Sequence, residues 1–305
     1  MARRRHGCET RRILTCPRRT LALLVSLAIV SCSGSGPEET PTSADTNTTS
    51  PATTTTVSAT TTTGLGELPD EGPGPEGVEI TPPDDGTAAT GPAVVLVHGG
   101  SWIGGSPRLL DDWAEALASE GAVIFNASYR LARSSEGGYP ESIDDIVCAV
   151  RFARQRAPEF TESDELIVMG HSSGGHLAAV AALAGDEFGA DCPYPKAPLP
   201  DRLVGLAAIY DLEVVSMLSV VFMGATLQEM PEAWASANPI DLVDHRNDLE
   251  TVVIVAGEDR LLPESMAENF ASALTPNTDV KIIPGADHLD LQDPETVDLD
   301  LVLGD

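Results

Sequence analysis

Five residues near the middle of the chain, Gly170-His-Ser-Ser-Gly174, form a G-x-S-x-G pattern around Ser172, a serine that could act as a nucleophile. Leu166 to Met169, just before the pattern, is short, apolar and partly β-branched, which predicts a buried strand. Leu177 to Ala184, just after it, is a run of small apolar residues that predicts a helix. A strand and a helix joined by so sharp a turn approach closely, so the turn needs glycines. The pattern predicts Ser172 as the nucleophile of an acyl-transfer reaction. The alternative is a glycine–serine loop without chemistry.

A serine hydroxyl is a poor nucleophile until a positioned base takes its proton, and the six histidines of the chain are the candidates for this base. His171 and His176 flank the turn, whose geometry is expected to point them away from the position that Ser172 faces. His6 lies in the N-terminal segment, His98 precedes two glycines, and His245 lies in a polar stretch, which leaves His288. His288 follows a predicted strand near the C-terminus and is therefore the predicted base. The alternative is a structural histidine in that loop.

The base needs an acid that orients it. The segment Gly257-Glu-Asp-Arg-Leu-Leu-Pro263 follows another predicted strand, and we predict Asp259 rather than Glu258 as the acid. The carboxylates next to the histidine lie too close to it along the chain. The resulting order of serine, aspartate and histidine is the one expected when the serine lies on a strand–turn–helix.

The oxyanion that develops during acyl transfer needs backbone N–H donors. Ser173, next to the nucleophile, supplies one such group. The segment His98-Gly-Gly-Ser-Trp102 is expected to supply others, from Gly100 and Ser101, because its glycines let the backbone approach the substrate. The alternative is a turn that needs glycine only for its own conformation.

Elements that alternate between buried strands and helices must position these groups. The apolar pattern predicts strands at 77–81, 93–97, 122–125, 166–169, 203–209, 251–255 and 280–283, and helices at 108–119, 140–152, 177–184, 263–274 and 296–303. Such alternation predicts an α/β fold with a mostly parallel central sheet and helices on both faces. All the polar clusters follow strands, so they are expected at the shared carboxyl edge, where such sheets bind ligands.

The chain resembles serine carboxylesterases of the α/β-hydrolase fold, in the branch of hormone-sensitive-lipase-like and acetylesterase-type enzymes. The resemblance covers about residues 92 to 290. It rests on His98-Gly-Gly-Ser-Trp102, Tyr129-Arg-Leu131, Tyr139-Pro140 through Asp145, Gly170-His-Ser-Ser-Gly-Gly-His-Leu-Ala178, Tyr210-Asp-Leu212, Asn238-Pro239, Asp259 and His288. It implies Ser172 as nucleophile, His288 as base and Asp259 as its partner, with Gly100, Ser101 and Ser173 around the oxyanion. Ser101 stands where many relatives have a third glycine, which a backbone donor tolerates.

The segment 213–237 lies between two predicted strands and is rich in methionine and aromatic residues. In the family that the chain resembles, this position is a cap over the acyl pocket. We therefore expect Met223 and Trp234 of this segment to contact substrate, together with Trp102, which follows the two glycines. Because the cap is short, we expect the substrate to carry a small acyl group. The alternative is ordinary core packing, which uses the same residue types.

The N-terminal residues 1–31 carry seven of the eighteen basic residues and the apolar run Leu21 to Val30, which is too short to span a bilayer. The run ends before Cys32 in a segment that resembles a bacterial lipobox. It predicts a lipoprotein signal peptide with Cys32 lipidated; the alternatives are an uncleaved anchor or an ordinary signal. Residues 32–66 are nearly all Ser, Thr, Pro, Gly, Ala and acidic residues, which predicts a disordered tether before a hydrolase domain at 67–305.

A net charge of −29 disfavours nucleic acids and anionic lipid surfaces as partners, so the expected partners are a small-molecule ester and a membrane reached through the lipid at Cys32. The sequence leaves the oligomeric state open. No cluster has metal-ligand spacing, and we expect no metal or other cofactor. Cys148 and Cys192 are expected to form a disulfide if the protein is exported to an oxidising compartment, or to remain two buried thiols.

Two other functions fit the same residues. The stretches His-Gly-Gly-x-Trp and Gly-His-Ser-x-Gly-Gly-His also resemble arylformamidases, although export disfavours their cytosolic chemistry. The third reading is a surface-binding module without catalysis, which a complete set of serine, aspartate and histidine at strand ends disfavours.

Overall fold

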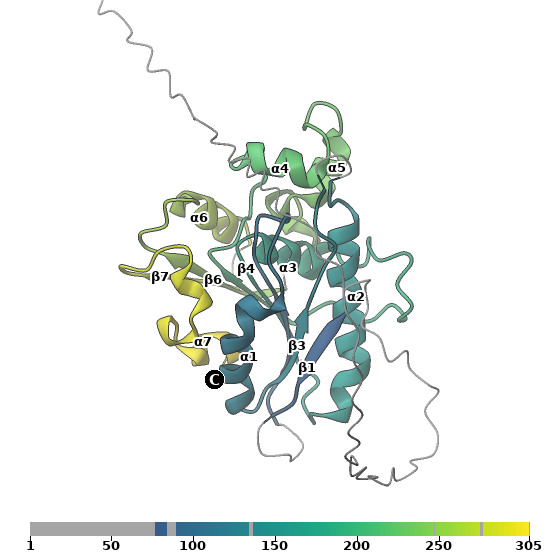
Figure 1. Ribbon diagram of the computed structural model, residues 1–305, viewed down its shortest axis with the longest axis vertical. Helices are drawn as coiled ribbons and strands as arrows, with labels where there is room; N and C mark the ends of the chain where they lie inside the picture. Colours follow the sequence, from purple (N-terminus) through teal and green to yellow (C-terminus); the bar gives the residue numbers. More distant parts are fainter. Residues whose placement is uncertain (1–76, 84–89, 134–136, 247, 275–276, 305) are drawn as a thin grey trace, which may run out of the picture. The chain divides into compact units, whose positions relative to one another are not determined.

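A seven-stranded sheet in the order β1-β3-β2-β4-β5-β6-β7 lies at the centre of the computed structural model, which describes residues 77–83, 90–133, 137–246, 248–274 and 277–304 (Figure 1). β1 pairs antiparallel with β3, and every other pair is parallel. This confirms the predicted α/β fold with a mostly parallel sheet. The strands are β1 (Val78–Thr81), β2 (Ala93–Val97), β3 (Val123–Ala127), β4 (Leu166–His171), β5 (Arg202–Leu206), β6 (Glu250–Ala256) and β7 (Thr278–Ile283).

Helices cover both faces of this sheet (Figure 1). Side chains of α2, α3 and α6 pack on one face, and side chains of α1 and α7 pack on the other. Alternate residues of β2 enter the two cores, with Val95 in the first and Leu96 in the second. Because both faces are covered, β2 is apolar along its whole length and the other inner strands are mostly apolar. The helices are α1 (Asp111–Ser119), α2 (Glu141–Arg156), α3 (Ser173–Ala184), α4 (Ser216–Met223), α5 (Pro231–Ala237), α6 (Glu264–Ala273) and α7 (Leu299–Leu303).

Several predicted boundaries are wrong: α2 ends four residues later than predicted, at Arg156, and α3 begins four residues earlier, at Ser173. The helix predicted at 108–119 begins as a 3-10 turn, Pro107–Leu110, and becomes α-helical at Asp111. The terminal helix predicted at 296–303 is confined to α7, after the 3-10 turn Pro294–Thr296. The strand predicted at 203–209 stops at Leu206, because Ala207 takes a positive φ of 40°. The chain then turns toward the serine turn (residues 170–174), where the Ile209 N–H donates to the Ser172 carbonyl at 3.3 Å.

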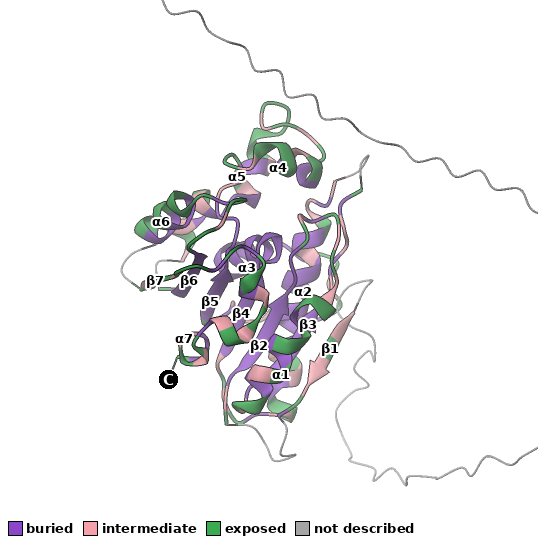
Figure 2. Ribbon diagram, turned by 60° about the vertical axis from the view of Figure 1, so that its left-hand side comes forward, coloured by how far each residue is buried: buried purple, intermediate pink, exposed green. Residues whose placement is uncertain are grey.

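The predicted cap segment, residues 213–237, contains α4 and α5, which lie above the sheet edge in both ribbon views (Figures 1 and 2). Phe222 and Met223 of α4 are buried, whereas Met217 of the same helix is 88% exposed. Leu218 and Val221 are also exposed. One apolar side of this helix therefore faces solvent.

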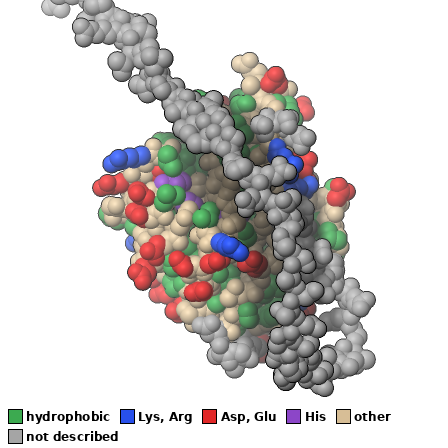
Figure 3. Space-filling view, in the orientation of Figure 1, with side chains coloured by type: hydrophobic (Ala, Val, Ile, Leu, Met, Phe, Trp, Pro, Cys, Tyr) green, Lys and Arg blue, Asp and Glu red, His purple; other side chains and the backbone are tan. Residues whose placement is uncertain are grey.

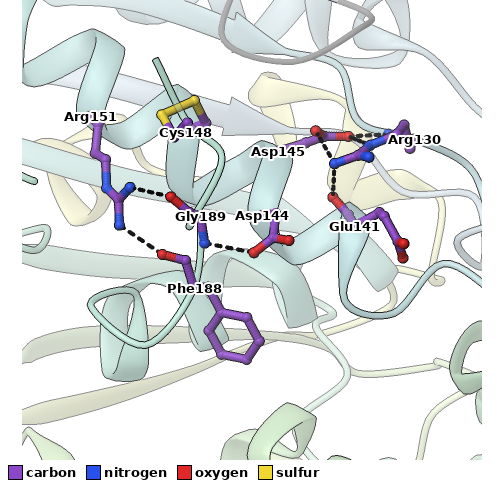
Figure 4. The surroundings of a disulfide bond; sticks show 9 residues. Arg130, Glu141, Asp144, Asp145, Cys148, Arg151, Phe188 and Gly189 are labelled. Carbon is purple, nitrogen blue, oxygen red and sulfur yellow. Dashed lines mark hydrogen bonds and ion pairs between the residues drawn. A yellow bond between two sulfur atoms is a disulfide. The ribbon is translucent and has the colours of Figure 1, made fainter. Parts of the chain in front are cut away.

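A disulfide joins Cys148 of α2 to Cys192, in the loop that follows α3 (Figure 4). Arg151 of α2 fixes the same loop by donating to the Gly189 carbonyl at 2.6 Å and the Phe188 carbonyl at 2.7 Å. The Gly189 N–H in turn donates to Asp144 Oδ1 at 2.6 Å. Covalent and charged contacts together hold this loop to the helix.

The predicted signal peptide (1–31), the lipidation site Cys32 and the tether (32–66) lie outside the described residues. Within the described ranges, no helix is both long and apolar enough to cross a membrane. On the face shown in Figure 3, acidic side chains are more numerous than basic ones, in agreement with the net charge of −29.

Candidate active site

Ser172 lies at the sharp connection between β4 and α3, with φ 54° and ψ −119°. A non-glycine residue with this backbone is strained and persists only where its surroundings fix it. Two glycines allow the turn to close. A Cβ on Gly170 would lie 2.4 Å from the Gly174 carbonyl oxygen, and one on Gly174 would lie 2.2 Å from the Val97 carbonyl oxygen. The serine turn is therefore built as the sequence predicted, with a strained residue between close-packed glycines.

The structure brings together the three residues that the sequence singled out for catalysis. His288 Nε2 lies 2.9 Å from Ser172 Oγ, and His288 Nδ1 lies 2.7 Å from Asp259 Oδ2. The three come from loops after β4, β6 and β7, so they meet at the carboxyl edge of the sheet. All three side chains are largely buried, which strengthens hydrogen bonds to the carboxylate.

The contacts of Asp259 define which nitrogen of the imidazole carries the proton. Asp259 Oδ1 accepts from the backbone N–H groups of Leu261 and Leu262, at 2.7 and 3.0 Å. Its other oxygen is thus aimed at His288 Nδ1, which must donate because an ionised carboxylate only accepts. Nε2 is then left with a lone pair that faces the hydroxyl of Ser172. This is the arrangement required of a general base.

The glycine loop (residues 98–105) passes beside the serine turn. Gly100 has φ 129°, and its carbonyl accepts from the N–H groups of Ile103 and Gly104, at 3.1 and 3.0 Å. A Cβ on Gly99 would lie 3.3 Å from the Ser172 Cβ, so the loop backbone runs against the serine. Among described residues, the N–H groups of Gly100, Ser101 and Ser173 have no hydrogen-bond acceptor. They are free to bind an oxyanion.

His171 lies behind the base and was not assigned a role from the sequence. Its Nε2 donates to the His288 carbonyl at 2.9 Å, and the two rings are 4.9 Å apart. Gln292 Nε2 approaches the other ring nitrogen at 3.4 Å. Burial lowers the pKa of His171 to about 4, so the ring is neutral at pH 7. A histidine in the x position of G-x-S-x-G carries no sequence signal for this contact, because its partner lies 117 residues away.

The lowered pKa of His171 makes stability depend on pH. The unfolded histidine binds a proton below about pH 6.5, whereas the folded one does so only near pH 4, so the free energy of unfolding falls as pH drops through this window. Between pH 7 and 5, wild type is expected to lose about 1–2 kcal/mol more than His171→Gln, which does not titrate. Chemical denaturation of both proteins at the two pH values measures this. The same loss in both would contradict the assignment.

Trp102, Met223 and Trp234, predicted to contact substrate, are instead packed in the interior, with 0%, 3% and 2% of their surface exposed. The Trp102 indole N–H donates to His176 Nδ1 at 3.2 Å, and the Trp234 indole N–H donates to the Ala225 carbonyl at 3.1 Å. Their burial and these hydrogen bonds do not support the predicted substrate contacts of the three residues. A core position and a pocket wall require the same large apolar side chains.

A cavity of about 600 Å³ opens on the far side of the glycine loop. Its walls come from the loops after β2 and β3 and the start of α2, and include His98, Tyr129 and Arg130. The three catalytic candidates do not line it. The cavity is therefore separate from the hydroxyl of Ser172. In the ranges that the structure describes, no three His, Cys, Asp or Glu side chains are grouped as a metal site would require.

Comparison with known proteins agrees with this geometry. The sequence profile of the BD-FAE family matches residues 78–274. Esterase LipC of Mycobacterium tuberculosis is 31% identical over 215 residues, which cover 65% of this chain and 52% of LipC. Ethyl acetate hydrolase of Pseudomonas putida is 33% identical over 103 residues, covering 33% of this chain and 32% of that protein. The chain thus spans about half the length of LipC and less of the hydrolase.

A solved structure shows the same fold. The propionate-bound form of the Est2 esterase of Thermogutta terrifontis superposes with a TM-score of 0.56 at 20% identity. The superposition covers 69% of this chain and 79% of that one. The fold is therefore that of the α/β-hydrolases.

Proposed function

Because the chain belongs to the BD-FAE family, we propose that it is a serine hydrolase that cleaves carboxylic esters. The observation that carries the proposal is the continuous chain of hydrogen bonds from Asp259 through His288 to Ser172, with distances of 2.7 and 2.9 Å. The esterase names of LipC and ethyl acetate hydrolase support the reaction class.

The reaction follows from the positions of the protons. His288 Nε2 takes the proton of Ser172 Oγ as the oxygen attacks the ester carbonyl, and Asp259 stabilises the imidazolium that forms. The N–H groups of Gly100, Ser101 and Ser173 bind the oxyanion. His288 then gives its proton to the departing alcohol, which leaves an acyl group on Ser172. Water, deprotonated by His288, attacks this acyl-enzyme and releases the acid and the free serine. These steps need no metal or other cofactor.

A short acyl group fits this site best. The cap segment contributes only α4 and α5, of eight and seven residues, and its largest inward side chains fill the interior. Little cap surface is then left to bind a long chain.

Hydrolysis of p-nitrophenyl esters with acyl chains of two to twelve carbons tests the proposal. We expect kcat/KM to be highest at two to four carbons and to fall by at least about tenfold by twelve, because an acyl chain longer than the pocket can bind only by displacing packed side chains. Equal or faster hydrolysis of the long esters would refute the short-acyl preference.

The two other functions predict different results in the same assay. Cleavage of N-formylkynurenine without cleavage of any simple ester would indicate an arylformamidase. A folded protein that neither cleaves these substrates nor reacts with a fluorophosphonate would indicate a surface-binding module.

We also propose that the protein is exported and held at the outer face of a bacterial membrane by a lipid on Cys32. The basic N-terminal segment, its apolar run and the cysteine that follows support this proposal. The Cys148–Cys192 disulfide supports an oxidising compartment. Cells that express the full chain should incorporate labelled fatty acid into it, and the variant Cys32→Ser should not; equal labelling of both would exclude Cys32 as the site.

A further inference from the structure

The glycine loop holds two consecutive strained residues that its own sequence does not stabilise. Ser101 and Trp102 have φ values of 53° and 62°, in the left-handed region that disfavours side chains. Each such residue is strained and persists only where surrounding contacts fix it. Ser101 is also one of the residues whose free N–H faces the proposed oxyanion. The contacts that hold Trp102 therefore decide where that N–H lies.

Trp102 is held from three sides. Its ring stacks on Phe222 of α4, with centroids 4.8 Å apart and planes at 22°. Its backbone carbonyl accepts from the Ala132 N–H at 2.8 Å. Its indole N–H donates to His176 Nδ1 at 3.2 Å, and the two rings meet edge to face at 5.2 Å. Among the described residues, His176 is the one hydrogen-bond partner of the Trp102 side chain.

His176 connects this contact to the nucleophile. It lies one turn into α3, and its backbone N–H donates to the Ser172 carbonyl at 3.1 Å. Its Nε2 lies 2.8 Å from the Ala237 carbonyl, at the end of α5. Since a carbonyl only accepts, Nε2 carries the proton and Nδ1 has the lone pair that the indole requires. Complete burial lowers the pKa of His176 to about 4, which keeps the ring neutral and this lone pair available.

We propose that His176 is a positioning residue that sets the glycine loop, through Trp102, at the distance from Ser172 that oxyanion binding requires. The proposal rests on the esterase function proposed above. His176 touches neither substrate nor the reacting atoms. It links the start of α3, the glycine loop and the end of the cap segment through one imidazole. Substitution should therefore weaken binding of the transition state more than binding of the ester, because the oxyanion forms only in the transition state.

Four variants test this proposal by their kcat, KM and melting temperature with p-nitrophenyl acetate. His176→Leu removes both nitrogens, His176→Asn returns an acceptor near the position of Nδ1, and Trp102→Phe removes the donor and part of the indole but keeps an aromatic ring. Val180→Ala, one turn further along α3 and fully buried, is the control for lost packing in the same helix.

We expect His176→Leu and Trp102→Phe each to lower kcat about 10–100-fold with KM within about threefold of wild type, as for a donor displaced by a fraction of an ångström. His176→Asn should recover most of the loss. The double variant should be no slower than the slower single variant, because both changes break the same bond. The apparent pKa of the kcat/KM profile, which reports His288, should stay unchanged. Val180→Ala should lose stability and keep its kcat.

Wild-type kcat in folded His176→Leu or Trp102→Phe would overturn the proposal, as would an equal loss of kcat in Val180→Ala. Should His176→Leu fail to fold, Trp102→Phe and His176→Asn decide the question. A wild-type enzyme without esterase activity would refute the proposed function instead, so the two failures are distinguishable.

Discussion

Replacing Ser172 with alanine is expected to lower kcat for p-nitrophenyl acetate by about 10⁶-fold, to a residual rate that the oxyanion donors alone support. Ser172 Oγ is the atom that His288 Nε2 faces at 2.9 Å, and without it no acyl-enzyme forms. Hydrolysis would then require direct attack by water in a site built for the serine. Steady-state kinetics measure the loss, and a fluorophosphonate probe should no longer label the protein.

The neighbouring variant Ser173→Ala is the matched control. It also removes one hydroxyl from the serine turn, but it keeps the backbone N–H that we assign to oxyanion binding. Its kcat should stay within about tenfold of wild type, which is a smaller loss than removal of an oxyanion donor causes. If Ser172→Ala retained wild-type activity, or if labelling moved to Ser173, the nucleophile would be assigned wrongly.

Replacing Asp259 with asparagine is expected to lower kcat about 10⁴-fold at pH 7 with little change in structure. The reason lies in the two N–H groups, of Leu261 and Leu262, that bind Oδ1. They will select the amide oxygen, which turns the amide NH₂ toward His288 Nδ1. The imidazole must then accept at Nδ1 and carry its proton on Nε2. In that tautomer it cannot take the proton of Ser172.

Glu258→Gln is the control for this experiment, because it makes the same chemical change one residue away on an exposed side chain. Its kcat should stay close to that of wild type. A large loss in Glu258→Gln with none in Asp259→Asn would reverse the choice between the two acids. Equal small losses in both would mean that His288 acts without an orienting carboxylate.

The arrangement of Ser172, Asp259 and His288 could be predicted from the sequence because each of these residues leaves a local signal. The turn at Ser172 needs a glycine two residues before it and another two residues after it, since a Cβ on Gly170 or Gly174 would collide with backbone. Asp259 follows a buried apolar strand and His288 follows the strand at the edge of the sheet, and parallel strands end at one edge. Patterns of this kind also predicted the seven strands, and they failed mainly at boundaries. At Ala207 the chain turns toward the serine, so β5 stops at Leu206 although the apolar residues continue beyond it.

The residues that hold the site in place could not be predicted in the same way. His171 and His176 contact His288 and Trp102, partners 117 and 74 residues away, and nothing next to them in the sequence marks either contact. Trp102 looked like a pocket wall because large apolar side chains serve equally in a pocket and in a core. Its burial follows from Phe222, which reaches it from α4.

By itself, the sequence determined the order of strands and helices, the strained serine and the triad, because burial, close approach and chain order act locally. The roles of the buried histidines and of Trp102 were decided only by the tertiary structure. A polar ring in the interior takes its tautomer and its function from whichever distant groups the fold places against it.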